Sequence, residues 1–351
     1  MTFFLKVMAC FFSYVLLESK TIVITGGAGF IGATVTQNLL KRGDSVIVID
    51  AFLSLDSING DRYNAMKRER IFTLQQQFPD TLHFYECNIE DKETLRAIFS
   101  KYQIDAVCHL AAHAGVRFSM QFPNEVAKTN IEGTINILEL MKDYKVKHGV
   151  LASSSSVYGN TTQIPFTENQ PTDMQSSLYG ATKKSLELIA YAYHNLYDLS
   201  LTCLRFFTVY GPYGRFDMSP FIFMDAIYHE KPITIYGDGS AIRDFTYIDD
   251  IIQGIIKAID KPAGYQKLNL GAGRTITIKE FISLIGDIVG KEPIISFQES
   301  FAADVNMTQA SITKAQNLLN YNPQYTVRSG IKLMYEWYKE YENKKNSTVT
   351  V

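Results

Sequence analysis

The sequence is poor in the residues that mark small disulfide-bonded or metal-binding proteins. Its 351 residues include four cysteines, Cys10, Cys87, Cys108 and Cys203, and no two of them form a C-x-x-C pair. No histidine cluster stands at ligand spacing either. We therefore expect free thiols in a reducing compartment, and no metal site.

An excess of charge of one sign is also missing. The 34 lysines and arginines nearly balance 36 aspartates and glutamates, which gives a formal net charge of −2. Without a basic stripe we expect no nucleic-acid partner, and no polybasic patch for a membrane surface. A hydrophobic share of 46% fits a globular chain that can bury a full core. The length suits two domains, or one large domain with a smaller lobe.

No hydrophobic run reaches the length of a membrane span. The longest near the start, residues 7–17 (VMACFFSYVLL), is well short of the roughly 20 residues required. It follows Lys6 like a weak signal peptide, but no clear small-residue cleavage site precedes Lys20. We expect residues 1–19 to form a loosely docked or disordered extension of a cytoplasmic protein. A membrane or secretory role and a misassigned start remain alternatives.

What the sequence does contain is an alternation of short apolar strands with helices. Uninterrupted β-branched runs such as Thr21–Thr25 are typical of strands buried on both faces. The pattern predicts an α/β fold with a doubly wound parallel sheet. Further strands are expected at 45–49, 82–86, 106–110 and 149–152, with helices near 92–101 and 125–144. After about Arg215 the alternation loosens, with a strand at 232–236 and helices at 248–259 and 278–289.

A glycine-rich turn, TGGAGFIG, follows the first strand and opens a helix. Gly26, Gly29 and Gly32 let the backbone turn sharply and approach a pyrophosphate, which the helix N-terminus then binds. Asp50 closes the second strand, where a carboxylate accepts from a ribose 2′-hydroxyl and repels a 2′-phosphate. The pattern therefore indicates a Rossmann dinucleotide site that binds NAD rather than NADP.

Other residues at this edge of the sheet extend the predicted cofactor site. Asn88 and Ile89 follow the third strand and could face the adenine. Asn130 falls in a predicted helix, where a surface asparagine is the alternative. The full set is Gly26, Gly29, Phe30, Ile31, Gly32, Asp50, Asn88, Ile89, Leu110, Ala111, Ala112, Asn130, Tyr179 and Lys183.

The main chemical signal is Tyr179 followed four residues later by Lys183, in LYGATKK. On a helix both side chains share one face, and an ammonium beside a phenol lowers the phenol pKa from its usual ~10 toward neutrality. A phenolate can accept a hydroxyl proton as hydride leaves the carbon beneath it. This spacing alone is common on helices.

A second signal is the serine row Ser153 to Ser156, in ASSSSVYG, at the end of a predicted strand. A hydroxyl there can hold a sugar oxygen by donating one hydrogen bond and accepting another. A plain polar loop is the alternative. Together with the glycine turn and the Tyr–Lys pair, the row favours a catalytic site.

These motifs resemble those of a known family. TGGAGFIG, HLAAHAGVR, SSSSVYG, YGATK, LRFFTVYGP and IRDFTYIDDI look like the extended short-chain dehydrogenase/reductase family of nucleotide-sugar epimerases and dehydratases, from Thr21 to the last helix. Within it the chain is most similar to the UDP-glucuronate 4-epimerases. The resemblance implies that Tyr179 is the base for the 4-hydroxyl, that Lys183 binds the nicotinamide ribose, and that Ser154 orients the hydroxyl.

The residues after Ser154 bear on the reaction type. Dehydratases and decarboxylating relatives place acidic residues there, whereas this chain has Ser155 and Ser156, whose hydroxyls are too weak as bases. A transient 4-keto sugar would then survive and be reduced from its other face, which is epimerisation with NAD regenerated in each cycle.

The resemblance also implies a set of substrate contacts. Ser155, Ser156, Thr208 and Arg215 would hold a sugar carboxylate, which suits a guanidinium. The alternative for Arg215 is a surface ion pair with Asp217.

A second group concerns the nucleotide. Arg243 would bind the UDP diphosphate, with an ion pair to Asp244 or Asp238 as its alternative. Ile235 and Tyr236 would line the uracil pocket, and Arg117 would lie near the sugar, with a phosphate or structural role equally open. Where relatives carry Asp and Pro-Gly-Asp, this chain has Asn88 and, in the second case, Ala302, Ala303 and Asp304.

The sequence thus predicts conversion of UDP-glucuronate to UDP-galacturonate. A 4-epimerase of UDP-glucose or UDP-N-acetylglucosamine is the alternative within the family. A non-catalytic NAD-binding sensor is disfavoured because Tyr179 and Lys183 are both present. We expect an NAD-binding domain at 20–215 that carries the catalytic residues, a nucleotide-sugar lobe at 216–340, a polar tail at 341–351 and, by analogy, a homodimer.

Overall fold

The computed structural model describes residues 19–53, 60–299 and 305–348. The predicted N-terminal extension, apart from its last residue, lies outside this range, and so does the Ala302–Asp304 segment. Among the described residues, no helix has both the length and the apolarity needed to cross a bilayer.

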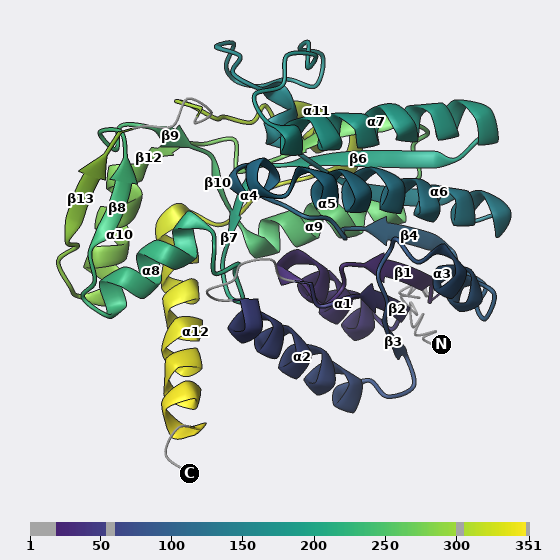
Figure 1. The fold of residues 1–351 in the computed structure, drawn as a ribbon, viewed down its shortest axis with the longest axis horizontal. Coiled ribbons are helices and arrows are strands. Elements are labelled where there is room, and N and C mark those ends of the chain that lie inside the picture. Colours follow the sequence, from purple (N-terminus) through teal and green to yellow (C-terminus); the bar gives the residue numbers. More distant parts are fainter. Residues whose placement is uncertain (1–18, 54–59, 300–304, 349–351) are drawn as a thin grey trace, which may run out of the picture.

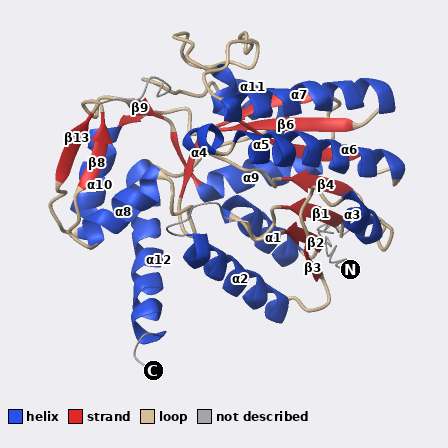
Figure 2. Cartoon of the chain, viewed as in Figure 1, coloured by secondary structure: helices blue, strands red, loops and turns tan. Residues whose placement is uncertain are grey.

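A seven-stranded sheet forms the centre of the molecule, in the order β11-β6-β5-β4-β1-β2-β3. Every neighbouring pair is parallel, which confirms the predicted doubly wound α/β fold. Helices cover both faces (Figure 2). The strands are β1 (Thr21–Thr25), β2 (Ser45–Asp50), β3 (Leu82–Glu86), β4 (Ala106–His109), β5 (His148–Ser154), β6 (Ser200–Phe206) and β11 (Gln266–Leu270).

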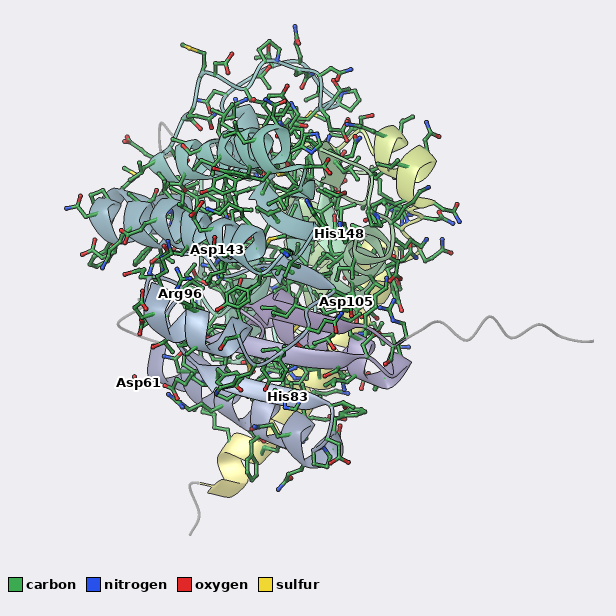
Figure 3. The ribbon with its side chains drawn as sticks, turned by 90° about the vertical axis from the view of Figure 1, so that its right-hand side faces the viewer. Asp61, His83, Arg96, Asp105, Asp143 and His148 are labelled. Atoms are coloured by element: carbon green, nitrogen blue, oxygen red, sulfur yellow. The ribbon has the colours of Figure 1, made fainter. Side chains whose placement is uncertain are left out.

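The central strands β1 and β2 are largely apolar because each face packs on helices. In β1, Ile22 and Ile24 point into one core and Val23 into the other, since successive side chains alternate across a strand. One core is shared with α1 (Phe30–Arg42), α2 (Gly60–Gln77) and α9 (Ile248–Asp260), and the other with α3 (Lys92–Phe99), α6 (Thr134–Asp143) and α7 (Leu178–Tyr197). Figure 3 labels Asp105 and His148, at the amino ends of β4 and β5.

The long helix predicted over 125–144 is interrupted. It consists of α5 (Pro123–Ala127), a π-helical turn (Lys128–Gly133) and α6. A π turn widens the helix locally and changes the direction in which the following side chains point. Asn130 lies in this turn and is buried, so the surface-asparagine alternative is wrong.

A smaller lobe lies beside one end of the sheet (Figure 1). Three pairs of short strands build it, together with the helices α8 (Ser219–Tyr228), α10 (Ile278–Val289) and α12 (Val327–Thr348), whereas α11 (Thr313–Leu319) packs on β11 of the main sheet and on α9. The pairs are β7 (Thr208–Tyr210) with β10 (Phe245–Tyr247), β8 (Ile233–Tyr236) with β13 (Ile295–Gln298), and β9 (Ile242–Arg243) with β12 (Ile276–Thr277).

Two features of the structure bear on the expected division of the chain, which stays a prediction. Within 216–340, α9 and β11 return to the main sheet, where β11 pairs with β6, because a parallel neighbour needs a helical crossover. The lobe that we propose is therefore discontinuous in sequence. The polar tail expected at 341–351 is helical through Thr348. Although this segment is polar in composition, its Glu342 is only 2% exposed, and the carboxylate pairs with Arg62 of α2 at 2.7 Å.

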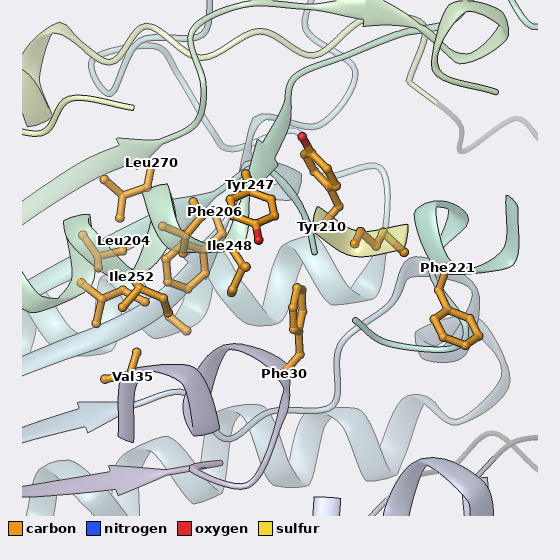
Figure 4. Close-up of a cluster of buried hydrophobic side chains, with 14 of the residues drawn as sticks. Phe30, Val35, Leu204, Phe206, Tyr210, Phe221, Tyr247, Ile248, Ile252 and Leu270 are labelled. Carbon is orange, nitrogen blue, oxygen red and sulfur yellow. The ribbon is translucent and has the colours of Figure 1, made fainter. Parts of the chain in front are cut away.

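The two parts share a continuous apolar core. Phe30 and Val35 of α1 and Phe206 of β6 pack in the same buried cluster as Tyr247 and Phe221 (Figure 4). This core lies under the cavity described next, so the floor of the cavity is built from both parts of the chain.

Candidate active site

A cavity of about 670 Å³ opens at the carboxyl ends of the central strands, where doubly wound sheets bind ligands. Its wall contains most of the predicted cofactor residues and two of the predicted substrate residues. These are Gly26, Gly29, Phe30, Ile31, Gly32, Asp50, Asn88, Ile89, Leu110, Ala111, Ala112, Arg117, Tyr179, Lys183 and Arg215. The wall does not include Asn130, Ser154, Ser155, Ser156, Thr208, Ile235, Tyr236 or Arg243.

The glycine turn closes too tightly for any side chain. Gly26 has a φ of +68°, and a Cβ at Gly32 would lie 2.1 Å from the carbonyl oxygen of Gly26. Gly29 caps α1 without a side-chain hydrogen bond, which leaves first-turn N–H groups for a ligand. This cradle fits the pyrophosphate of NAD.

Asp50 is fixed by three donors at the end of β2. Its carboxylate accepts from the main-chain N–H of Ala28 at 3.0 Å and of Phe52 at 2.8 Å, and Lys67 Nζ lies 3.0 Å away. Asp50 and Lys67 are both buried and both line the cavity. A carboxylate held in this way fits the role of acceptor for a ribose hydroxyl. The sequence did not indicate Lys67, because it comes from α2, whose position relative to β2 depends on tertiary structure.

Asn130 braces the cavity from behind its wall. Its amide oxygen accepts from His113 N–H at 2.8 Å, and its amide nitrogen donates to the His113 carbonyl at 2.9 Å and to Thr182 at 3.0 Å. These bonds tie the loop after β4 to α7. Asn130 therefore holds the cavity wall in place and does not form part of it.

Tyr179 and Lys183 lie on α7, which begins at the N-cap Ser177. Lys183 Nζ donates to the carbonyl of Ala152 at 2.8 Å and lies 5.9 Å from the Tyr179 ring centroid. Burial lowers the pKa of Lys183 to about 8.

The phenol of Tyr179 has a different balance of effects from the one expected. Burial raises its pKa, while a hydrogen bond with Ser154 and the positive charge of Arg215 act in the opposite direction. The prediction that Lys183 lowers the tyrosine pKa is therefore wrong in direction for the protein alone. The buried site disfavours an anion, and the ammonium is engaged by a main-chain carbonyl.

The serine row divides at the end of β5. Ser153 lines the cavity and donates to Glu187 at 2.7 Å. Ser154 acts to lower the pKa of the Tyr179 phenol, and its Oγ donates to Ser156 Oγ at 3.2 Å. Ser155 and Ser156 begin a short 3₁₀ turn. Of the four serines, only Ser154 is thus described in contact with the phenol.

Behind the row lies a buried ion pair that the sequence did not indicate. Glu187 accepts from Arg205 Nε and Nη2, each at 2.7 Å, and the two side chains are 1% and 0% exposed. A glutamate two helical turns after Tyr179 was the available signal.

Arg215 combines both of its predicted alternatives. It lines the cavity, and it forms a two-point ion pair with Asp217, which lines the cavity as well. Its Nη2 also donates to the carbonyl of Ala114 at 2.9 Å. The pair therefore belongs to the cavity wall and is not an isolated surface contact. Thr208, in β7, donates its main-chain N–H to the main-chain carbonyl of Asp244 at 3.2 Å.

The residues predicted to bind the nucleotide of the substrate lie in different environments. The guanidinium carbon of Arg117 lies 4.4 Å from the Tyr236 ring centroid, so the wall of the cavity contacts β8 of the lobe. Ile235 is 3% exposed and packs in the core, because alternation along β8 turns it inward. Its side chain therefore faces the core, and its place in a uracil pocket stays a prediction.

Arg243 donates from Nη1 to the carbonyls of Ile242 at 2.9 Å and Asn306 at 3.3 Å. The carboxylate of Asp244 accepts from the main-chain N–H groups of Ala272, Gly273 and Ala310. That of Asp238 accepts from Ser240.

One cluster among the described residues has metal-ligand spacing: Asp225, His229 and Glu342. It joins α8 to α12 outside the cavity wall. Tyr338 donates to Asp225 at 2.7 Å, and Arg62 pairs with Glu342, so both carboxylates already have partners. We therefore assign it no metal.

Comparison with known proteins agrees with a dinucleotide-binding site in this cavity. Residues 22–271 match the NAD dependent epimerase/dehydratase family. The chain is 45% identical to the UDP-glucuronate 4-epimerase of Thermodesulfobacterium geofontis over an alignment of 320 residues. This alignment covers 91% of this chain and 96% of that relative.

Two solved structures are similar over nearly the whole fold. The UDP-glucuronic acid 4-epimerase of Bacillus cereus, in complex with UDP-glucuronic acid and NAD, has a TM-score of 0.83 and 33% identity over 92% of this chain and 99% of that one. The UDP-glucose 4-epimerase of Thermotoga maritima, with UDP-glucose, has a TM-score of 0.80 and 31% identity over the same shares.

Proposed function

Because the chain belongs to the NAD dependent epimerase/dehydratase family, we propose that it inverts carbon 4 of UDP-glucuronate to give UDP-galacturonate. It is an NAD-dependent isomerase. The observation that carries the proposal is the shared cavity, in which Tyr179, Lys183 and Arg215 line the wall beside the glycine cradle, while Ser154 and Arg215 both act on the pKa of the Tyr179 phenol.

The glycine turn and Asp50 would hold NAD, which would supply a hydride acceptor for carbon 4 and a hydride donor for its opposite face. In its phenolate form Tyr179 accepts the proton of the 4-hydroxyl as the C–H bond breaks, and it returns that proton to the C4 oxygen when the ketone is reduced. Ser154 holds the same oxygen through both steps, because its hydroxyl both donates and accepts. Lys183, fixed on the carbonyl of Ala152, presents an ammonium at the cavity wall that suits the hydroxyls of a ribose.

The residues beside Ser154 determine what happens to the ketone. Ser155 and Ser156 offer hydroxyls and no carboxylate, so no strong base at these positions is available to remove the C5 proton or to promote loss of a group. The ketone is therefore reduced, and the sugar leaves with carbon 4 inverted.

Arg215 supports a uronic acid as the sugar. Its positive charge acts to lower the pKa of the Tyr179 phenol, because the guanidinium lies near that hydroxyl. A carboxylate at carbon 6 suits this residue better than the neutral hydroxymethyl group of UDP-glucose. The relatives from T. geofontis and B. cereus are UDP-glucuronate epimerases, which agrees with this choice.

We also propose a homodimer that forms through α7. Leu188, Tyr191 and Leu196 are 59%, 54% and 68% exposed on this helix. Apolar side chains gathered on one helix are typical of a surface that a second copy covers.

The test is a panel of UDP-sugars incubated with purified protein and no added NAD, with the products identified by NMR. We expect UDP-galacturonate from UDP-glucuronate, and no product with Tyr179→Phe. Tyr335→Phe, at a half-buried tyrosine of α12 outside the cavity wall, is the matched control and should turn over like the wild type. Conversion of UDP-glucose or UDP-N-acetylglucosamine in preference would make the sugar assignment wrong. If none of the UDP-sugars were converted, the alternative of a non-catalytic NAD-binding protein would be favoured.

A further inference from the structure

Most N–H donors of the Arg215 guanidinium that could bind a carboxylate at two points are already hydrogen-bonded within the protein. Its N–H donors lie in one plane and offer a carboxylate two seats: a side seat formed by Nε with one Nη, and an end seat formed by both Nη atoms. Asp217 occupies the side seat, with Nε donating to Oδ1 at 3.0 Å and Nη2 to Oδ2. The remaining N–H of Nη2, which the end seat requires, donates to the carbonyl of Ala114 at 2.9 Å.

A second carboxylate can therefore reach Nη1 alone unless one of these partners leaves. Single-point contact forgoes the paired hydrogen bonds that make arginine a strong and specific partner for a carboxylate. For a sugar carboxylate to bind at two points, either Asp217 or the carbonyl of Ala114 has to release Arg215.

The two partners differ in their freedom to move. Ala114 is bonded through its main chain, and the residue before it, His113, is clamped at both its N–H and its carbonyl by Asn130. Asp217 is bonded through a side chain that is 40% exposed and can turn into water without leaving a buried charge. Asp217 is thus the partner that can leave.

We propose that Asp217 is an internal carboxylate that occupies the seat of the sugar carboxylate on Arg215, and that a uronic acid binds by displacing it. This inference rests on the proposed function. A neutral hexose carries no anion to exchange and leaves the Arg215–Asp217 pair in place. The exchange makes Asp217 a specificity-determining residue, and it keeps the cation paired before substrate arrives.

The proposal has a quantitative consequence. Affinity for a uronic acid is reduced by the fraction of molecules in which Asp217 already holds the seat. A partly exposed ion pair contributes at most about 1 kcal/mol, which corresponds to roughly fivefold in binding. Removing the internal carboxylate should therefore strengthen binding of UDP-glucuronate about threefold to fivefold. Ligands without a sugar carboxylate should not respond.

The experiment is calorimetric titration of the NAD-loaded protein and of Asp217→Asn with UDP-glucuronate, UDP-glucose and UDP. We expect the Kd of UDP-glucuronate alone to fall in the variant. Equal tightening of all three ligands would mean a general effect of charge, and weaker or unchanged binding of UDP-glucuronate would mean that Asp217 only positions Arg215. Either result overturns the proposal.

Asp287→Asn provides the matched control, since it makes the same charge change at a carboxylate that is 57% exposed and lies 3.6 Å from Arg328. It should leave all three Kd values unchanged. If D217N does not fold, structures of the wild type with UDP-glucuronate and with UDP-glucose decide the matter, because Asp217 should leave Arg215 only in the first.

Epimerisation of UDP-glucuronate by the wild type distinguishes failure of this inference from failure of the proposed function. If it does not epimerise UDP-glucuronate, the proposed function fails and the inference fails with it. If it does so while D217N shows no selective gain, the inference alone fails.

Discussion

The ammonium of Lys183 lies 2.8 Å from the carbonyl oxygen of Ala152, at the end of the strand that carries the serine row. The side chain is 3% exposed, and burial lowers its pKa to about 8 from the usual 10.5. The molecule thus keeps a cation in an unfavourable place, which is typical of a group retained for chemistry.

Replacing that cation should stabilise the fold while it abolishes turnover. Below pH 8 the folded wild type bears the full penalty of the buried charge, and the penalty fades as the pH rises from about 8 toward 10.5, where the unfolded lysine also loses its proton. Lys183→Met should therefore gain about 1–3 kcal/mol in free energy of unfolding at pH 7, and much less at pH 10. Urea unfolding at both pH values measures the difference.

Lys184→Met is the control for this comparison, because Lys184 is the next residue on α7 and is only half-buried. It should show neither the gain in stability nor its dependence on pH. A Lys183→Met protein that is less stable than the wild type at pH 7 would contradict the idea that the ammonium is held against its preference.

The Asp50–Lys67 pair should behave as a single buried unit. Lys67→Met leaves the Asp50 carboxylate buried with two main-chain N–H donors and no counter-charge, which we expect to lower the free energy of unfolding by about 3 kcal/mol. Adding Asp50→Asn removes the uncompensated charge and should recover most of that loss. Urea unfolding of the two single variants and the double variant measures the coupling. A coupling energy near zero would mean that Lys67 does not compensate Asp50.

The sequence predicted the elements whose local pattern and tertiary environment agree. Strands such as Thr21–Thr25 are buried on both faces, so a continuous apolar run was a sufficient signal. Gly43 ends α1 in a left-handed conformation, which is typical of a glycine directly after a helix. The glycine turn and Asp50 line the cavity because a strand–turn–helix unit fixes them relative to one another within a short stretch of chain.

The misses have a common physical cause. Lys67 reaches Asp50, and Glu187 reaches Arg205, between consecutive elements whose relative orientation is set by tertiary packing, so spacing alone does not reveal these pairs. Asn130 faces inward because of a π turn that periodicity does not predict. The return of β11 to the sheet follows from pairing with β6, which a local pattern cannot specify.

Gly32 should be irreplaceable for cofactor binding, in contrast to a glycine at the other end of the same helix. A Cβ at Gly32 would lie 2.1 Å from the Gly26 carbonyl oxygen, so Gly32→Ala has to open the turn that faces the pyrophosphate. We expect purified Gly32→Ala to contain less than about a tenth of the NAD of the wild type, measured by absorbance after denaturation.

Gly43→Ala gives the matched comparison. Gly43 has a φ of +99° but open space around a Cβ, so the change strains the backbone by about 1 kcal/mol without touching the cradle. It should lower stability slightly and keep its NAD. Equal loss of NAD in both variants would show that stability of α1, and not the shape of the turn, controls retention of the cofactor.

The Glu187–Arg205 pair should hold α7, and with it Tyr179, against β5 and β6. Glu187→Gln leaves the fully buried Arg205 guanidinium without a counter-charge, which we expect to cost about 3–5 kcal/mol in urea unfolding. Ser153→Ala removes one hydrogen bond to the same carboxylate and should cost only about 1 kcal/mol. Glu86→Gln, in an ion pair whose side chains are 53% and 50% exposed, should have no measurable effect. This order follows from burial, because an uncompensated charge is costly only where water cannot reach it. A Glu187→Gln protein as stable as Glu86→Gln would mean that water enters between α7 and the sheet, and that the phenol is held by its helix alone.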